Sequence, residues 1–142
     1  MIKDAKILIE NAIKKIKESS NKKGITGVQT GFKDLDNITN GLQEGDLIII
    51  AGRPGMGKSL LATSIVKNVA IKNGQAVAFF PLESSSQYHI TRMIASETGV
   101  SFDTFRQGVL EPHEWELLNL KLDRLSKSPI YMEDALLSFS DL

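Results

Sequence analysis

The sequence lacks several features that would assign it to a class at once. It contains no cysteine, which excludes disulfide bonds and thiolate metal sites. No apolar run approaches the ~18 residues that a membrane-spanning helix needs. Neither sign of charge predominates, because Lys and Arg together number 17 and so do Asp and Glu. Any binding of nucleic acid must therefore come from a local surface or an assembly rather than from net charge.

The first residues also do not resemble a secretory signal peptide. Lys3, Asp4, Lys6 and Glu10 interrupt the apolar stretch that such a signal requires. We therefore expect a cytoplasmic protein with no membrane partner. What the 142 residues do contain is 42% apolar side chains, which is enough for one domain with a hydrophobic core.

Residues 1–18 predict an amphipathic helix. The following SSNKKG, residues 19–24, breaks the pattern and is typical of a short linker. The chain is thus predicted to divide into a helix with its linker, residues 1–23, and a domain over residues 24–142. The apolar stripe of this predicted helix can pack on its own domain or on another subunit, and the pattern alone does not choose between them. The apolar side chains of the stripe recur at spacings of three and four and are Ile2, Ala5, Ile9, Ala12, Ile13 and Ile16.

Beyond the linker, predicted strands alternate with predicted helices. The strands are near-continuous apolar runs of the kind buried on both faces of a sheet, and the helices show apolar residues at helical spacing. The predicted strands are 46–52, 76–82 and 129–133, and the predicted helices are 58–72, 86–99 and 111–127. This alternation predicts an α/β fold with a parallel sheet flanked by helices.

The stretch AGRPGMGKSLLA, residues 51–62, lies between a predicted strand and a predicted helix, and its spacing is that of a phosphate-binding loop. Its glycines let backbone N–H groups turn toward one anion, and the following helix directs its unpaired N–H groups at the same anion. Lys58 is expected to reach the β- and γ-phosphates of a bound nucleotide, and the Ser59 hydroxyl to ligate Mg²⁺. The residues predicted to hold the nucleotide are Gly52, Arg53, Pro54, Gly55, Met56, Gly57, Lys58, Ser59 and Leu60.

Other chemistry-bearing side chains are less specific. Glu83 follows the second predicted strand at the sheet edge that faces the γ-phosphate, yet from the sequence alone it is equally a solvated residue or a charge at a helix entry. His89 and His113 lack the partner spacing of a metal site. Trp115 lies on a leucine stripe at helical spacing, which predicts a core position rather than a base-stacking platform.

The segment GITGVQTGFKDLDNITNGLQEGDLIIIAGRPGMGKS, followed by FFPLESS and later SPIYMED, resembles the C-terminal ATPase domain of the bacterial replicative DNA helicases of the DnaB family. The resemblance runs from about Gly24 to the last residue. Relatives of the RadA and KaiC kind share GL..GDL and the loop but not the rest. The resemblance implies a P-loop NTPase of RecA-like fold, a hexameric ring, and ATP hydrolysis coupled to translocation on, and unwinding of, DNA.

Position by position, the resemblance implies roles for individual residues. Gly52, Gly57, Lys58 and Ser59 match the residues that bind the phosphates and Mg²⁺. Glu83 matches the glutamate that acts as general base on the attacking water. Lys58 and Glu83 are therefore the predicted catalytic residues.

The resemblance also implies partners. Residues 1–18 fall where the family carries a linker helix that docks on the neighbouring subunit, which favours self-association through the isoleucine stripe. Single-stranded DNA is expected to bind through the parent hexamer, and primase and a helicase loader are further expected partners. Arg92 matches a family arginine, but an arginine on a helix is most often a solvated charge, so no role is predicted for it.

Several family features are changed or missing. The usual Ser-Leu-Glu-Met-Ser is Pro-Leu-Glu-Ser-Ser here, over residues 81–85, which changes local packing more than chemistry. A second Mg²⁺-binding aspartate is expected at the end of a later apolar strand, and Asp134 matches it poorly because residues 130–134 lack a continuous apolar run. The family's DNA-contacting loops and the cation that a neighbouring subunit inserts at the γ-phosphate have no counterpart.

We therefore expect the front part of a helicase motor, incomplete at its C-terminus and with an uncovered sheet edge. By itself it is expected to bind ATP and Mg²⁺ weakly, without turning ATP over or unwinding DNA at a useful rate. The alternative is a truncated, non-catalytic module that binds helicase subunits or a loader. A RadA- or KaiC-like ATPase is a third interpretation, against which GITGVQTGFKDLDNITNGL argues.

Overall fold

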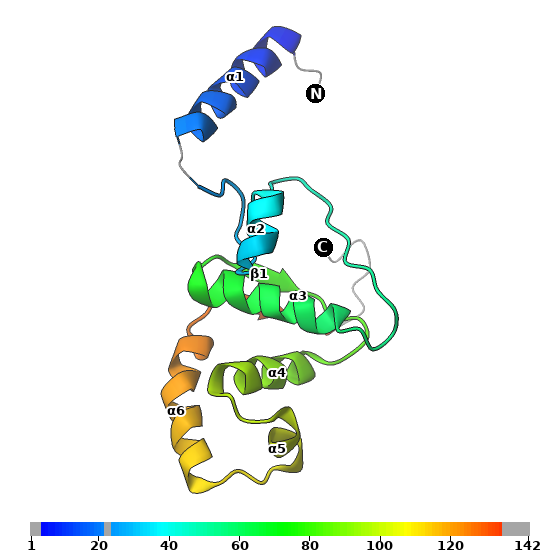
Figure 1. The fold of residues 1–142 in the computed structure, drawn as a ribbon, viewed down its shortest axis with the longest axis vertical. Helices are drawn as coiled ribbons and strands as arrows, with labels where there is room; N and C mark the ends of the chain where they lie inside the picture. Colours follow the sequence, from blue (N-terminus) through cyan, green and yellow to red (C-terminus); the bar gives the residue numbers. More distant parts are fainter. Residues whose placement is uncertain (1–3, 22–23, 135–142) are drawn as a thin grey trace. The chain divides into compact units, whose positions relative to one another are not determined.

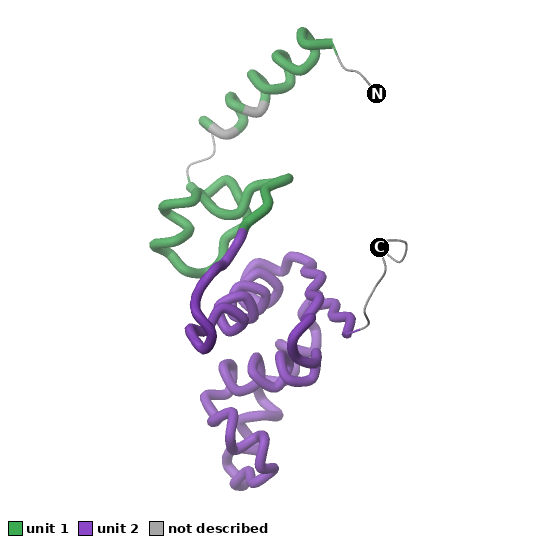
Figure 2. The backbone as a smooth tube through the Cα atoms, turned by 90° about the vertical axis from the view of Figure 1, so that its right-hand side faces the viewer, with its two compact units in different colours: residues 1–48 green, residues 49–142 purple. Residues whose placement is uncertain are grey.

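The computed structural model describes residues 4–21 and 24–134. The backbone divides into two compact units, residues 1–48 and 49–142 (Figure 2), and each is described by itself. The elements, in chain order, are α1 (Ala5–Asn21), α2 (Lys33–Thr39), α3 (Lys58–Lys67), the π-helical η1 (Asn68–Lys72), β1 (Val77–Phe79), α4 (Ser86–Thr98), α5 (Phe102–Gln107), α6 (Pro112–Ser126) and β2 (Ile130–Met132) (Figure 1). None of the helices in these residues has the length and apolar character needed to cross a membrane.

The first unit begins with α1, which confirms the helix predicted from the sequence. The helix ends at Asn21 rather than at residue 18, so the first residues of the predicted linker, 19–21, are helical. Ile2, the first residue of the predicted stripe, lies outside the described residues. Ile9, Ile13 and Ile16 are exposed, so this face of α1 is an uncovered apolar surface in the described part of the chain.

The rest of the first unit is organised around a buried carboxylate on α2. Asp36 is 3% exposed; its Oδ1 accepts hydrogen bonds from the backbone N–H and the hydroxyl of Thr30, each at 2.7 Å, and its Oδ2 accepts from the Gly31 N–H at 3.1 Å. Nearby, Val28 and Leu42 form an antiparallel bridge. The backbone beside this bridge approaches so closely that the glycines there have no room for a side chain.

Helices of the second unit pack around a two-stranded parallel sheet. β1 and β2 pair in the register Val77 with Ile130 and Phe79 with Met132, and α4, α5 and α6 form the crossover that a parallel pair requires. The centre of the core combines one residue from each of three helices, namely Val66 of α3, Met93 of α4 and Leu125 of α6. The predicted parallel sheet with flanking helices is therefore present, although small.

The strand predicted for residues 46–52 is wrong. These residues form neither helix nor strand, and the run expected to be buried on both faces is exposed, with Leu47 87% and Ile49 78% exposed. A strand requires a neighbour for its backbone N–H and C=O groups. The strands of the described residues, β1 and β2, pair with each other, so the apolar run lacks such a neighbour there.

Local signals set the helix boundaries in this unit. The Ser85 hydroxyl caps α4 by accepting from the Tyr88 N–H at 3.2 Å, and Gly99 ends the helix in the left-handed region with φ of 79°. Pro112 occupies the first turn of α6, where Glu111 and Glu114 form a reciprocal capping box. These boundaries lie close to those predicted from the sequence.

An ion pair joins the C-terminal end of α3 to α4. Lys67 Nζ lies 2.9 Å from Glu97 Oε1 and donates a hydrogen bond to the Ser96 hydroxyl at 2.7 Å. The hydrogen bond from Lys67 holds the pKa of Glu97 below its usual 4.5, against the opposing effect of burial. The folded state therefore favours the charged carboxylate, and its contribution to stability is present above about pH 4.5 and lost as the pH falls.

We expect Glu97→Gln to lower the free energy of unfolding by about 0.5–1 kcal/mol at neutral pH and by less in acid. Urea unfolding at pH 7 and pH 4 measures both values. Glu116→Gln, which changes an exposed glutamate on α6, is the control. Equal destabilisation of the Glu97 variant at the two pH values would contradict an electrostatic origin.

Candidate nucleotide-binding site

The loop before α3 leaves a helix N-terminus open. Gly55 and Gly57 adopt φ values of 77° and 87°, which side-chain-bearing residues rarely adopt, and the Met56 N–H turns back to the Arg53 carbonyl at 3.2 Å. Gly57 is the N-cap of α3, and no side chain caps this end. Within residues 4–21 and 24–134, the first backbone N–H groups of α3 thus have no capping side chain and can receive an anion.

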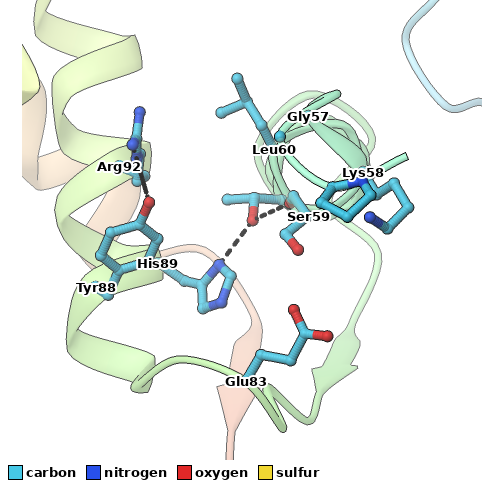
Figure 3. Close-up of a pocket in the computed structure, with 11 residues that line it drawn as sticks. Gly57, Lys58, Ser59, Leu60, Glu83, Tyr88, His89 and Arg92 are labelled. Carbon is cyan, nitrogen blue, oxygen red and sulfur yellow. Dashed lines mark hydrogen bonds between the residues drawn. The ribbon is translucent and has the colours of Figure 1, made fainter. Parts of the chain in front are cut away.

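This helix end faces a cavity of about 560 Å³ within the second unit (Figure 3). Its walls come from the loop and α3, from the segment after β1, and from α4. The lining residues are Pro54, Gly55, Gly57, Lys58, Ser59, Leu60, Thr63, Glu83, Tyr88, His89 and Arg92. The cavity thus brings most of the predicted phosphate-binding residues together with the predicted general base.

Three residues of the predicted set do not line the cavity. Gly52, Arg53 and Met56 belong to the loop but are not among the residues of the cavity wall. Gly52 lies against the stem of Lys58, since a Cβ added to Gly52 would be 3.5 Å from Lys58 Cγ. Its place in the structure is beside the lysine rather than in the wall.

Glu83 comes from the segment that follows β1. Its carboxylate points toward the first turn of α3, which carries Lys58 and Ser59 (Figure 3). The carboxylate of Glu83, the ammonium of Lys58 and the hydroxyl of Ser59 therefore line the same cavity. Glu83 lies 24 residues after Ser59 in the sequence.

Arg92 adds a cation to the cavity wall that the sequence interpretation left without a role. Its Nε and Nη2 donate hydrogen bonds to the Tyr88 hydroxyl at 3.1 and 2.9 Å, and its guanidinium lies 4.1 Å from the centre of the Phe102 ring. The spacing of Tyr88 and Arg92, four residues apart on one helix, was the available sequence signal. The two aromatic side chains hold the guanidinium in a defined place.

His89 is the most buried polar group of the wall, at 3% exposed. Its Nδ1 lies 2.8 Å from the Thr63 hydroxyl of α3, and its Nε2 lies 2.8 Å from the Ser84 hydroxyl. Burial lowers the pKa of His89 below its usual 6.5; Asp134 opposes this effect and Arg92 adds to it. The lowered pKa favours the neutral form of the ring.

Two further residues from the sequence analysis have other surroundings. Asp134 accepts hydrogen bonds from the backbone N–H and hydroxyl of Ser86, so it stabilises the N-terminus of α4, and it does not line the cavity. Trp115 is 51% exposed, so its predicted core position is wrong, whereas Leu118 and Leu125 of the same stripe are buried.

Comparison with known proteins shows similarity to one group of helicases. The family profile of the DnaB-like helicase C terminal domain matches residues 27–142. Over 110 residues the chain is 43% identical to the replicative DNA helicase DnaB of Geobacillus stearothermophilus, covering 78% of this chain and 24% of that protein. Over 120 residues it is 41% identical to the replicative DNA helicase DnaC of Bacillus subtilis (strain 168), covering 84% of this chain and 26% of that protein. The chain thus spans about a quarter of the length of these curated relatives.

Solved structures show the same relationship. A solved ATPase domain superposes with a TM-score of 0.81 at 27% sequence identity, covering 93% of this chain and 47% of that chain. A DnaB-like replicative helicase, solved in a study of its interactions with primase, superposes with a TM-score of 0.76 at 26% identity, covering 95% of this chain and 32% of that chain.

Proposed function

Because the chain belongs to the DnaB-like helicase C-terminal domain family, we propose that its cavity binds the phosphates of ATP together with Mg²⁺, as part of the ATPase domain of a replicative DNA helicase. The observation that carries this proposal is one cavity lined by the open N-terminus of α3, by Lys58 and Ser59, and by Glu83. These groups are the donors, the cation and the carboxylate that binding and hydrolysis of a nucleoside triphosphate require.

The donors fit a phosphate chain. Backbone N–H groups of Gly57 and of the first turn of α3 lie at the open end of the helix. They would donate to the phosphates of a bound nucleotide, with the positive end of the helix dipole behind them. The Lys58 ammonium neutralises charge on the β- and γ-phosphates. This requirement for backbone donors beside Lys58 explains why a loop with two glycines at positive φ precedes the helix.

The oxygen donors fit Mg²⁺. The ion prefers hard oxygen ligands and keeps several waters, so the Ser59 hydroxyl and phosphate oxygens are suitable partners. In the residues that the structure describes, no group of three or more His, Cys, Asp or Glu side chains forms a metal site of its own. A metal ion bound together with the nucleotide would neutralise charge on the β- and γ-phosphates.

Hydrolysis needs a general base for the attacking water and positive groups that stabilise the negative charge on the phosphate oxygens. Glu83 points toward the first turn of α3, where it can accept a proton from a water attacking the γ-phosphate (Figure 3). Arg92, held by Tyr88 and Phe102, supplies a second positive charge to the same cavity. Lys58 and Glu83 are the catalytic residues of this proposal.

The larger functions extend the proposal to the whole helicase. We infer that ATP hydrolysis drives translocation on single-stranded DNA and unwinding in a hexameric ring. The exposed isoleucines of α1 support self-association, because an uncovered apolar stripe on a helix needs a partner surface. Primase is proposed as a partner because the chain is similar to a DnaB-like replicative helicase whose interactions with primase were described together with its structure. A helicase loader is proposed as a partner from the family resemblance.

A titration that varies the metal tests the binding proposal. We expect the chain to bind ATP more tightly with Mg²⁺ than with EDTA, and Ser59→Ala to lose most of this gain, about tenfold in Kd, because the metal loses its protein ligand. Isothermal titration calorimetry measures the four dissociation constants.

Ser64→Ala is the matched control for this titration. Ser64 lies on the same helix, outside the cavity wall, and its hydroxyl donates to the Leu60 carbonyl at 2.8 Å. Its metal dependence should equal that of the unchanged chain. Absence of ATP binding by the unchanged chain, or an unaltered metal dependence in Ser59→Ala, would count against the proposal.

A further inference from the structure

His89 connects two parts of the candidate site that are distant in sequence. On one side its Nδ1 meets Thr63 of α3, whose hydroxyl donates to the Ser59 carbonyl at 2.7 Å. On the other side its Nε2 meets Ser84, the residue next to Glu83. The chain of contacts therefore runs from the proposed Mg²⁺ ligand to the neighbour of the proposed general base.

The hydrogen bonds in this chain have a single direction. Thr63 uses its one hydroxyl hydrogen on the Ser59 carbonyl, so its oxygen can only accept from the imidazole. The proton of the neutral ring must then lie on Nδ1, and Nε2 must accept from the Ser84 hydroxyl. The order of donation is Ser84 to His89, His89 to Thr63, and Thr63 to Ser59.

Two aromatic rings also pack against the imidazole. Phe79 of β1 lies edge-on to His89 with ring centres 4.9 Å apart, and Tyr88 lies edge-on at 5.5 Å. Residues 80–85, which include Glu83, form neither helix nor strand. A hydrogen bond to Ser84 therefore restrains a segment that has no regular backbone ladder of its own.

We propose that His89 is a positioning residue, which fixes the segment carrying Glu83 against the P-loop helix α3 through its bonds to Ser84 and Thr63. The inference rests on the proposed function, since it concerns how Glu83 is held relative to the phosphate-binding residues. It assigns no direct contact with nucleotide to His89. A change at Ser59 on nucleotide binding is transmitted to Glu83 through the imidazole.

The first part of the test locates the ring proton. In chain labelled with ¹⁵N-histidine, NMR distinguishes a proton on Nδ1 from one on Nε2, and the structure requires Nδ1. Thr63→Val removes the acceptor for that proton and should shift the ring toward the other tautomer, whereas Thr63→Ser should not. A ring protonated on Nε2 in the unchanged chain would overturn the inference.

The second part measures coupling between the two ends. Titration with MgADP should move the backbone amide signals of both Ser59 and Glu83 in the unchanged chain. In His89→Leu, which keeps bulk but no hydrogen bonds, we expect the Glu83 response at saturating MgADP to fall more than about twofold while the Ser59 response is kept. A Glu83 response that survives intact in His89→Leu would overturn the inference.

Partial substitutes separate positioning from packing. The amide of His89→Gln can accept from Ser84 and should restore part of the Glu83 response, whereas His89→Asn reaches toward Thr63 and should not. If His89→Leu fails to fold, Ser84→Ala decides the question, because it leaves the ring in place and should show the same loss. A Glu83 response in Ser84→Ala equal to that of the unchanged chain counts against the inference.

The two proposals fail in different ways. If the unchanged chain does not bind MgADP, the proposed function fails and the positioning role fails with it. If the unchanged chain binds MgADP and Lys58→Ala does not, but the His89 and Ser84 variants leave the Glu83 response unaltered, the positioning role alone fails.

Discussion

Replacing Lys58 by alanine is expected to weaken binding of MgATP by about 100-fold. The side chain lines the cavity at the N-terminus of α3, and its stem packs beside Gly52. A charge-assisted contact between an ammonium and phosphate oxygens contributes about 2–3 kcal/mol, which corresponds to roughly two decades in Kd. The backbone N–H groups that remain account for the residual affinity.

A second lysine near the end of the same helical run provides the control. Lys72 is exposed at the end of η1 and lies outside the cavity wall, so Lys72→Ala removes the same charge without removing a phosphate ligand. Titration of both variants with MgATP, at low and at high salt, should separate a local contact from a general loss of positive charge. Similar losses in the two variants would contradict the assignment of Lys58.

The parts of the fold that could be predicted from the sequence are those governed by local chemistry. The helix predicted for 58–72 is covered by α3 and η1, and the helix predicted for 86–99 ends at Gly99 as expected. In both cases the deciding features are glycines and apolar spacing within a few residues of one another. The short helices α2 and α5 were not predicted, because seven and six residues are too few for a periodic pattern.

The parts that could not be predicted depend on distant partners. The apolar run at 46–52 has the composition of a buried strand, yet a strand forms only with a neighbour, and periodicity carries no information about which neighbour is present. His89 was interpreted as a lone histidine because Thr63 lies 26 residues before it. No sequence spacing predicts a hydrogen bond between a histidine ring and a hydroxyl on another helix.

The candidate site divides in the same way. Loop residues such as Gly57, Lys58 and Ser59 were predicted as one set because the motif is contiguous, and they line one cavity in the structure. Arg92 reaches that cavity only through the packing of α4 against α3, with Tyr88 and Phe102 holding its guanidinium. The contiguous motif locates the phosphates, and the fold supplies the groups around them.

Replacing Asp36 by alanine is expected to lower the free energy of unfolding more than Glu97→Gln does. The buried carboxylate accepts three hydrogen bonds from Thr30 and Gly31, and its removal breaks all three at once. We expect the free energy of unfolding of the first unit to fall by about 3 kcal/mol, since hydrogen bonds to a buried charged group are strong. Hydrogen exchange at the Thr30 and Gly31 amides reports this loss directly, because these two N–H groups are the donors.

Asp34→Ala is the control for this substitution, because Asp34 is an exposed residue in the same first turn of α2. It should cost only the interaction with the helix dipole, about 0.3–1 kcal/mol, and leave the two amides protected. Equal exchange rates in the Asp34 and Asp36 variants would contradict the role given to the buried carboxylate.

Acid provides an independent check on Asp36. Burial alone would raise the pKa of this carboxyl, but the hydrogen bonds from the Thr30 hydroxyl and from the Thr30 and Gly31 N–H groups outweigh it and hold the pKa below 3.8. The folded state therefore releases the proton more readily than the unfolded state, and the stabilisation is complete well above pH 3.8 and lost as the pH falls below it. In the unchanged chain, protection of the Thr30 and Gly31 amides should fall as the pH drops below 3.8. Asp36→Ala has no carboxylate to protonate, so protection in this variant should already be low at neutral pH and should show no such pH-dependent fall.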